Sequence, residues 1–461
     1  MSTLSFGRIA ACIAAVFLTF AAPAQAQTAP WRDLVRGDST DGWRTLGGTA
    51  QFTIENGEVV GHAVLGSANT FLATRETFGD FILEYELKSD ARVNSGVQIR
   101  SESVPTYRNG VVHGYQVESD PSARAWSGGL YDEQRRQWLY TLIDNPTAQA
   151  AFNVGDWNHF RVEAIGNRIR TWVNGVPAAN VLDDMTPRGF IALQVHSIPN
   201  DPALVGLETR FRNIRILTRD LARYASPLND AIEEQNYIAN TVTERQAAQG
   251  WRLLWDGRTT NGWRGARLPG FPDHGWSIRD GLLSVEPSGG AESRNGGDII
   301  TTEDFSNFDL ELDFRVAPGG NSGIKYFVDP ELLRGEGSAI GLEYQILDDE
   351  RHPDAQLGVA GNRTLASLYD LIPATGKRAN PPGEWNRARI IVRGNHVEHR
   401  LNGGRVVEYE RGTQIFRALV AYSKYKDWPH FGELPAGPIL LQDHGDAVSF
   451  RSIRIRTLPA E

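Results

Sequence analysis

A small group of polar side chains in the C-terminal half of the chain combines an acid, a base and a cation. Glu343 and Gln345 are two residues apart, as are Gln442 and His444, and Lys325 precedes both pairs. Residues at even spacing share one face of a β-strand, so the members of each pair should point to the same side of a sheet. A carboxylate or imidazole beside an ammonium group can remove a proton from carbon and stabilise the oxyanion that forms. The candidate catalytic residues are therefore Glu343, His444, Lys325 and the adjacent Asp443.

The chain contains two copies of one pattern. Asn94-Ser95-Gly96 recurs as Asn321-Ser322-Gly323, and Phe78-Gly79-Asp80-Phe81 recurs at the same separation as Phe305-Ser306-Asn307-Phe308. Further pairs follow in the same order: Tyr115-Gln116 with Tyr344-Gln345, Leu130-Tyr131-Asp132 with Leu368-Tyr369-Asp370, Gly155-Asp156-Trp157-Asn158 with Gly383-Glu384-Trp385-Asn386, and Gln194-Val195-His196 with Gln442-Asp443-His444. A repeat of more than 200 residues predicts two whole domains, because the repeats of solenoids are only tens of residues long.

The first copy carries a matching but altered set of polar residues. Alignment of Tyr115-Gln116 with Tyr344-Gln345 puts Gly114 where Glu343 falls, and Glu118 supplies an acid further along. We therefore expect the first copy to bind a ligand without catalysis, and the second copy to carry the chemistry. The first-copy equivalents are Asn94, Gln98, Arg100, Gln116, Glu118, Tyr131, Gln194 and His196.

Alternating apolar residues predict the strands that position these side chains. The alternation is clearest at 81–87 and 308–314, while 159–173 and 388–401 are each interrupted by a Gly-Asn pair and predict hairpins. In the strand around Glu343, Tyr344 and Ile346 should fill the core. Repeated short strands with little helical periodicity indicate an all-β fold with an antiparallel two-sheet sandwich in each half. The acids on outer strand faces, Glu84, Glu86, Glu311 and Asp313, are expected to be solvated.

A helix is predicted between the two copies. Ser226 can cap it, Pro227 fits its first turn, and Gly250 is a natural stop. The predicted organisation is a signal peptide at 1–26, a first sandwich at 31–220, a helical linker at 221–250 and a second sandwich at 251–459.

Composition and the N-terminus limit the partners and the compartment. An apolar run at 9–22 followed by Ala24-Gln25-Ala26 has the pattern of a signal peptide, so a periplasmic or secreted protein is expected, and no later run is long enough to span a membrane. The net charge of −9 offers no basic stripe for nucleic acid. With 47 glycines and 12 tryptophans, the composition suits a β-rich protein that handles carbohydrate.

Several residues could orient a sugar beside the candidate catalytic group. Trp126, Trp138 and Trp428 lie in loop-like contexts and could stack on a sugar ring, whereas Trp157 and Trp385 are expected in the core. Adjacent pairs at 348–349 and 443–444 could bind a divalent metal such as Ca²⁺ or Mg²⁺, although adjacent acids also form turns. The sequence identifies no other cofactor. The candidate substrate-binding residues are Asn321, Gln345, Asp348, Tyr369, Gln442 and Trp428.

The second copy resembles the 3-keto-disaccharide hydrolase family. The motifs that carry the resemblance are 251–257, Asn261-Gly262-Trp263, Asn321-Ser322-Gly323-Ile324, 343–348, 383–386 and 441–445, and the first copy resembles a more divergent branch. The resemblance implies a concanavalin A-like jelly roll, export in bacteria, and cleavage of a glycosidic bond whose sugar is already oxidised at C3. A sugar 3-dehydrogenase is therefore expected to act first.

Three functions remain open at this stage. A ketone at C3 acidifies the hydrogen on C2, so a base could form an enolate that expels the C1 oxygen, after which water adds back. A tandem carbohydrate-binding protein is the alternative, because two sandwiches would gain affinity by avidity. Retaining hydrolysis of an unoxidised glucan has less support, because the run from Glu311 to Val316 lacks the second glutamate that such enzymes place on this strand.

Overall fold

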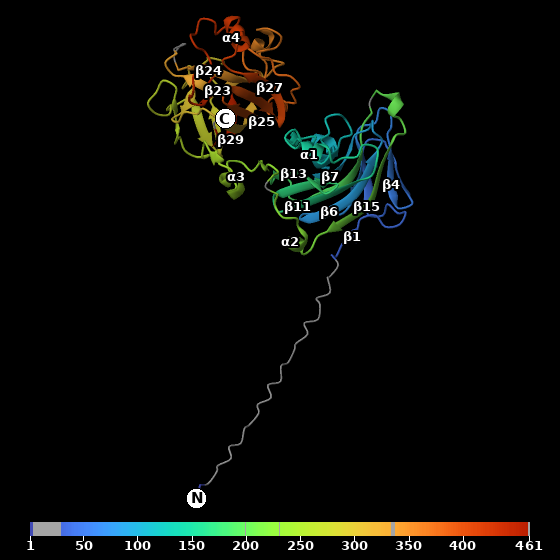
Figure 1. Ribbon diagram of the computed structural model, residues 1–461. Coiled ribbons are helices and arrows are strands. Elements are labelled where there is room, and N and C mark those ends of the chain that lie inside the picture. The colour runs from blue at the N-terminus through green and yellow to red at the C-terminus, as the bar shows by residue number, and fades with distance from the viewer. Residues whose placement is uncertain (3–28, 199, 230, 333–336, 460–461) are drawn as a thin grey trace.

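The computed structural model describes residues 1–2, 29–198, 200–229, 231–332 and 337–459, which form two β-sandwiches (Figure 1). The predicted signal peptide falls almost wholly outside the described residues. The predicted fold class is confirmed: each half of the chain is a concanavalin A-like sandwich of two mostly antiparallel sheets. No helix among the described residues is long and apolar enough to cross a membrane.

The first sandwich packs a nine-stranded sheet against a seven-stranded sheet. The larger sheet contains β1 (Arg32–Asp33), β3 (Phe52–Glu55), β4 (Glu58–His62), β6 (Phe81–Ser89), β11 (Asn158–Ile165), β12 (Arg168–Val173), β13 (Val176–Leu182), β15 (Glu208–Leu217) and β16 (Gln235–Asn236). The smaller sheet contains β2 (Trp43–Gly47), β5 (Thr70–Thr74), β7 (Ser95–Glu102), β8 (His113–Ser119), β9 (Leu130–Glu133), β10 (Gln137–Tyr140) and β14 (Phe190–Val195).

The second sandwich packs an eight-stranded sheet against a five-stranded sheet. The larger sheet contains β17 (Arg252–Leu253), β19 (Trp276–Arg279), β20 (Leu282–Val285), β22 (Phe308–Val316), β25 (Asn386–Arg393), β26 (His396–Leu401), β27 (Gly404–Glu410) and β29 (Val448–Thr457). The smaller sheet, in the order β18-β21-β28-β23-β24, contains β18 (Trp263–Gly265), β21 (Ile299–Thr301), β23 (Asn321–Asp329), β24 (Ile340–Leu347) and β28 (Leu440–Leu441). The helices are short: η1 (Arg108–Gly110), α1 (Pro146–Gln149), η2 (Pro202–Leu204), α2 (Leu221–Tyr224), α3 (Glu244–Ala248), η3 (Pro353–Gln356) and α4 (Gln414–Ala421).

The predicted strands and hairpins form where the sequence placed them. β6 and β22 contain the two alternating runs, and β11–β12 and β25–β26 are the two hairpins. Asn402 and Gly403 both adopt positive φ, 47° and 78°, which is the two-residue turn whose twist matches antiparallel strands. Tyr344 and Ile346 are fully buried in the core of the second sandwich, so their neighbours on β24 face outward as predicted.

The predicted long helix between the sandwiches is wrong. Ser226 and Pro227 do not begin a helix; their carbonyl oxygens instead accept hydrogen bonds from Arg170 of the first sandwich. The helices in the described part of the linker are α2 and α3. They are separated by β16, which adds to the first sandwich as a parallel neighbour of β13. The capping residues were present, but the apolar stripe needed to hold a long helix against either domain was only partial.

Charged residues lie buried at the contact between the two sandwiches. Glu311 and Asp313, predicted to be solvated, are each 4% exposed, and Arg454 and Arg387 donate to them. On the same sheet Arg389 binds Asp309, with 2.7 Å between Nη2 and Oδ2. Burial alone would raise the pKa of Asp309, but Arg389 and Arg456 hold it below its ordinary value. The acids are therefore structural, because the sheet face that carries them is covered.

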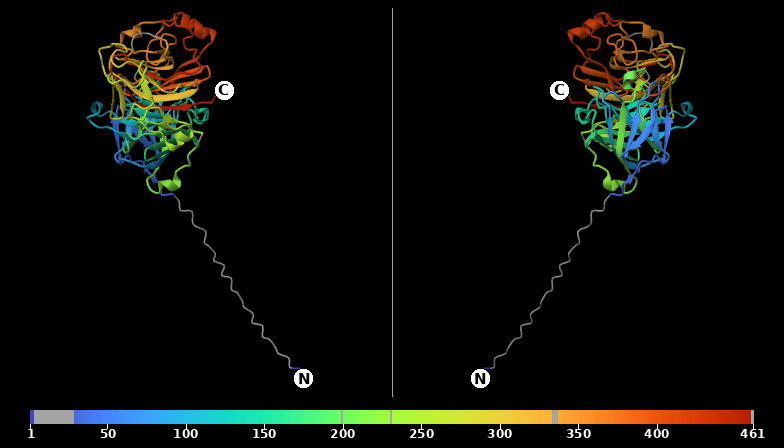
Figure 2. Two further views of the ribbon diagram at one scale, coloured as in Figure 1. Left: turned by 90° about the vertical axis from the view of Figure 1, so that its left-hand side faces the viewer. Right: turned by 90° about the vertical axis from the view of Figure 1, so that its right-hand side faces the viewer.

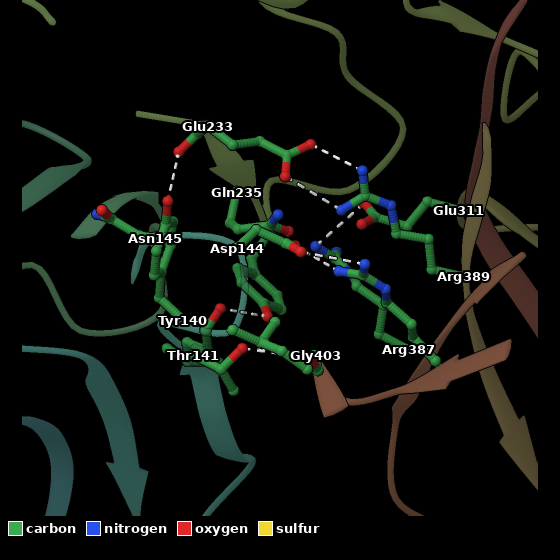
Figure 3. Close-up of a pocket in the computed structure, with 14 residues that line it drawn as sticks. Tyr140, Thr141, Asp144, Asn145, Glu233, Gln235, Glu311, Arg387, Arg389 and Gly403 are labelled. Atoms are coloured by element: carbon green, nitrogen blue, oxygen red, sulfur yellow. Dashed lines mark hydrogen bonds and ion pairs between the residues drawn. The ribbon is translucent and has the colours of Figure 1, made fainter. Parts of the chain in front are cut away.

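The linker and the first sandwich complete this charged contact. Glu233 of the linker binds Arg389 at 2.8 Å, and Asp144 of the first sandwich binds Arg400 at 3.1 Å, around a cavity of about 40 Å³ (Figure 3). Gln137 on β10 also donates to the carbonyl oxygen of Ala379 at 3.1 Å. The two sandwiches therefore lie against each other, as the two side views show (Figure 2).

Candidate active site on the second sandwich

A pocket of about 890 Å³ lies on the outer face of the five-stranded sheet. Lys325 on β23, Glu343 on β24 and Gln442 just after β28 line it, so three of the predicted site residues share one cavity. The loop at 290–294 and residues Lys424 and Tyr425, which follow α4, form the walls.

The strand register explains why these side chains converge. Lys325 lies directly opposite Glu343 across β23 and β24, and Gly323 lies opposite Gln345. On the other side of β23, the amide nitrogen of Gln442 donates to the carbonyl oxygen of Gly323 at 3.0 Å. A Cβ added at Gly323 would come within 3.0 Å of the carboxyl carbon of Glu343 and closer still to its Oε1. The Glu343 carboxylate therefore lies over a position where only glycine leaves room for it.

Glu343 has the environment of a general base. It is 5% exposed, and among the described residues none donates a hydrogen bond to its carboxylate. Burial raises the pKa of Glu343, while the charges of Lys325 and Lys424 partly oppose that shift. A carboxyl group with a raised pKa is a stronger base than an ordinary glutamate, which suits removal of a proton from carbon.

Lys325 is held by a buried acid that sequence reasoning missed. Its Nζ lies 3.5 Å from Oδ2 of Asp298 and donates to the carbonyl oxygen of Ala339 at 3.2 Å. Burial alone would lower the pKa of Lys325, but Asp298 and Glu343 raise it, so the ammonium stays charged. Asp298 precedes β21, in a segment outside the repeated motifs, so the pattern gave no signal for it.

Two amide groups offer further contacts on the same face. The Oε1 atoms of Gln345 and Gln442 are buried and have no hydrogen-bond partner among the described residues. Gln345 donates through Nε2 to Oδ1 of Asn321 at 3.4 Å. Buried acceptors without donors are uncommon in proteins, and hydroxyl groups of a bound sugar would satisfy them. The predictions for Asn321, Gln345 and Gln442 thus fall on one polar surface.

His444 does not line the pocket but joins a second group. His352, His444 and Asp446 each present a ligand atom, and these atoms lie within 4.8 Å of one another. Nδ1 of His352 accepts a hydrogen bond from the amide of Asp354 at 3.2 Å, which leaves Nε2 available. Asp446 accepts from the amide of Asn321 at 3.0 Å, so the group adjoins the Asn321 end of the face. His352 was missed because it lies in the loop after β24.

Asp443 and Asp348 have structural partners instead of substrate-facing positions. Asp443 is fully buried and accepts hydrogen bonds from the amides of Gly297 and Gly445, at 3.1 and 2.9 Å. Asp348 accepts from the amide of Gly319 at 2.7 Å and pairs with Arg351 at 2.9 Å. These carboxylates stabilise the loops around the site, as acids that begin turns commonly do.

The aromatic candidates differ in their positions. Tyr369 donates to Asp354 at 2.7 Å, and Nζ of Lys424 lies 4.0 Å from its ring centre, which puts it beside the pocket wall. Trp428 packs partly buried against the hydrophobic core and does not line the pocket. Trp385, expected in the core, is only half-buried, and Arg451 stacks on it at 4.0 Å. Trp157 is likewise half-buried under Arg212.

The first sandwich aligns differently from the sequence prediction. Gln98 lies opposite Gln116 and Gly96 opposite Glu118, the same arrangement as Lys325 opposite Glu343 and Gly323 opposite Gln345. Gln116, not Gly114, is therefore the equivalent of Glu343, and the acid and the amide have exchanged places between the copies. The exchange escaped sequence alignment because the Tyr-Gln match is shifted by two residues.

The polar residues of the first sandwich bind one another. Gln98 donates to Gln116 at 2.7 Å, Gln116 donates to Glu118 at 3.0 Å, and Asn94 also donates to Glu118. Burial raises the pKa of Glu118 to about 7. Gln194 is buried with neither amide atom partnered among the described residues. The cation and the base of the second sandwich are both replaced here by amides.

Three first-sandwich candidates take no part in this chain of hydrogen bonds. Arg100 occupies a β-bulge with φ of 45°, which turns it off the predicted face, and it donates to the carbonyl oxygens of Gly79 and Gly166, both at 2.8 Å. His196 contacts the carbonyl oxygen of Ser197 through Nδ1 at 2.8 Å. Tyr131 packs against Trp138, with ring centres 5.3 Å apart.

Comparison with known proteins matches both sandwiches. The family model of the 3-keto-alpha-glucoside-1,2-lyase-like domain matches residues 30–217 and 250–456. A 3-keto-disaccharide hydrolase from Bacteroides thetaiotaomicron is 41% identical over 231 residues, covering 46% of this chain and 79% of that protein. Two solved structures assigned as glycosyl hydrolases from Parabacteroides distasonis are each 28% identical. Their TM-scores are 0.42 and 0.34, and the matches cover 48% and 45% of this chain and 100% and 99% of theirs.

Proposed function

The chain belongs to the family of 3-keto-α-glucoside-1,2-lyase-like domains, and we propose that its second sandwich cleaves the glycosidic bond of 3-keto-glycosides by elimination followed by hydration. The broader activity, cleavage of a carbohydrate, follows from the family and from the 3-keto-disaccharide hydrolase relative. One observation supports the finer proposal most: Glu343, whose carboxylate accepts no hydrogen bond from the described residues, lies opposite the buried ammonium of Lys325 on the neighbouring strand, in a sugar-sized pocket.

Each side chain has a role that its environment suits. Glu343 removes the C2 hydrogen, which the C3 ketone acidifies, and the electron pair moves through the enolate to break the C1–O bond. Lys325 stabilises the negative charge that develops on the ketone oxygen. The protonated Glu343 then returns its proton to the departing oxygen, and water adds across the C1–C2 double bond. The products are a free 3-keto sugar and the alcohol that left C1.

Isotope exchange distinguishes this route from ordinary hydrolysis. A 3-keto-disaccharide turned over in D₂O should give a product labelled at C2, whereas its unoxidised parent should remain intact. Glu343→Gln and Lys325→Gln should each lower kcat by at least about a hundredfold, as expected for groups that act in the transition state. Glu118→Gln is the matched control, because it removes the buried acid of the other sandwich. Turnover without C2 label would exclude the mechanism.

The same proposal includes a divalent cation at His352, His444 and Asp446. Two imidazoles and one carboxylate suit a transition metal such as zinc or nickel better than Ca²⁺ or Mg²⁺, which prefer oxygen ligands. A bound cation would supply Lewis acidity beside the polar face. Zinc titration by calorimetry should show one site that His352→Ala and Asp446→Asn each abolish, whereas Asp348→Asn retains it. Unchanged binding in all three variants would reject these ligands.

We propose a non-catalytic role for the first sandwich, because Gln98 and Gln116 replace the cation and the base. The alternative that both sandwiches only bind carbohydrate remains testable. Under that alternative, a 3-keto-disaccharide and its parent would bind to the wild-type protein and neither would be turned over.

The compartment and the preceding reaction complete the proposal. The Ala24-Gln25-Ala26 pattern supports export to the periplasm or the medium, and N-terminal sequencing of the mature protein should then begin at Gln27. The ketone at C3 must come from an oxidation, so a sugar 3-dehydrogenase acts before this enzyme. An intact N-terminus on the mature protein would contradict export through this signal.

A further inference from the structure

A second pocket, of about 370 Å³, adjoins the candidate active site. Ile340 and Gly341, at the start of β24, line both pockets. Along the same strand Glu343 lies two residues beyond Gly341, and along β23 Phe327 of the second pocket lies two residues beyond Lys325. A group attached to a sugar in the first pocket can therefore extend along the two strands into the second.

The wall between the two pockets is aromatic. Tyr425 lines the first pocket, Phe431 lines the second, and their rings stack with centres 4.0 Å apart and planes inclined by 10°. Both belong to the segment that follows α4. A molecule that occupies both pockets would pass along this stacked pair.

Most of the side chains that line the second pocket are apolar. We define the aglycone pocket by Phe327, Leu332, Ile340, Phe431 and Leu434. Its polar residues are largely engaged: Glu433 pairs with Arg417 at 2.8 Å and with His430 at 3.2 Å. Asp329 accepts a hydrogen bond from the amide of Glu331 at 2.9 Å.

The loop that closes this pocket is held in place. Arg411 donates to the carbonyl oxygens of Gly432 and Leu434 at 3.1 and 3.0 Å, and its guanidinium lies 3.5 Å from the ring centre of Phe327. Arg411 is 6% exposed, so these contacts are shielded from water. The pocket is thus formed in advance of binding, as small-molecule sites usually are.

We propose that the aglycone pocket receives the group that leaves C1, and that it selects an apolar, ring-containing aglycone over a second sugar. A second sugar would bury several hydroxyl groups against side chains that offer few free partners, which is costly. An apolar ring would move from water into the pocket without losing any hydrogen bond. This inference rests on the proposed cleavage of 3-keto-glycosides.

Substrates with matched reactivity test the selection. Benzyl and methyl 3-keto-glucosides of one anomeric form release alcohols of similar acidity, so a difference in kcat/KM reports recognition. We expect the wild-type kcat/KM for the benzyl compound to exceed those for the methyl compound and a 3-keto-disaccharide by at least about tenfold. Leu434→Ser should reduce the benzyl-to-methyl ratio at least about fivefold, because it puts a hydroxyl in the pocket.

A surface variant and a stability measurement complete the design. Leu357, 55% exposed, lines neither pocket, so Leu357→Ser should keep the ratio within about twofold of wild type. Circular dichroism and melting temperature show whether each variant is folded. Equal rates for benzyl and methyl compounds, or a preference for the disaccharide, would overturn the inference while the proposed function stands. Failure to cleave all three ketones would reject the proposed function, and the inference would fall with it.

Discussion

Replacement of Gly323 by alanine tests the position of Glu343 without removing it. The added Cβ would stand 3.0 Å from the Glu343 carboxyl carbon and closer to Oε1, so the carboxylate must move by up to about 1 Å. A displacement of that size at a reacting group costs about a hundredfold in rate. Because the clash involves the end of a flexible side chain and Gly323 has no positive φ, stability should change by less than about 1 kcal/mol.

The assay is steady-state cleavage of a 3-keto-disaccharide, with the melting temperature measured in parallel. Gly96→Ala is the matched control, since the equivalent Cβ would meet Cγ of Gln116 at 2.7 Å in the sandwich that we propose to be non-catalytic. Gly96→Ala should keep wild-type kcat in the folded protein. A Gly323→Ala enzyme that is folded and within about threefold of wild-type kcat would refute the argument that this carboxylate, in this position, does the chemistry.

Three further outcomes follow from the charged groups. Because burial raises the pKa of Glu343, kcat/KM should rise with pH above the range of an ordinary glutamate, and a rise centred near pH 4 would contradict this. Burial alone would raise the pKa of Glu84, but His159, Arg215 and Arg161 lower it from 4.5 to about 2. The ionised Glu84 therefore stabilises the fold above pH 4.5, and this contribution is lost as the pH falls toward 2. Glu84→Gln should reduce the dependence on pH, over this range, of the free energy of unfolding measured in urea. Asp309→Asn should lower the free energy of unfolding by about 3–5 kcal/mol, because Arg389 and Arg456 lose a buried partner. The measurement is urea unfolding, and a loss below about 1 kcal/mol would show that these ion pairs are dispensable.

The alternation of side chains between the two faces of a strand predicted much of the candidate site, because this alternation depends only on local geometry. Once Tyr344 was placed in the core, Glu343 and Gln345 had to face outward together, and the same alternation put Asn321 and Lys325 on one face of their own strand. The structure shows that this strand, β23, pairs with β24. The sequence also predicted the hairpins, whose turn residues favour positive φ.

Residues whose roles depend on distant segments were missed or misplaced. Asp298 and His352 reach the site from loops, and their partners, Lys325 and His444, are far away in the sequence. Arg100 was misplaced because a single bulge reverses the parity of a strand. Glu311 was expected in solvent because its strand pattern does not show that a second domain covers that face.

The covered face of the second sandwich determines where the chain can be divided. Glu233 belongs to the linker by sequence, yet its carboxylate pairs with Arg389 of the second sandwich. Arg454 of the second sandwich likewise donates to the carbonyl oxygen of Asn236 in the linker. A fragment that starts at Gly250 would expose Asp309 and Glu311 with their arginines and lose these partners. Truncated proteins for study of the second sandwich alone should therefore begin before Glu233. Even these would expose to solvent a sheet face that is buried against the first sandwich in the intact chain.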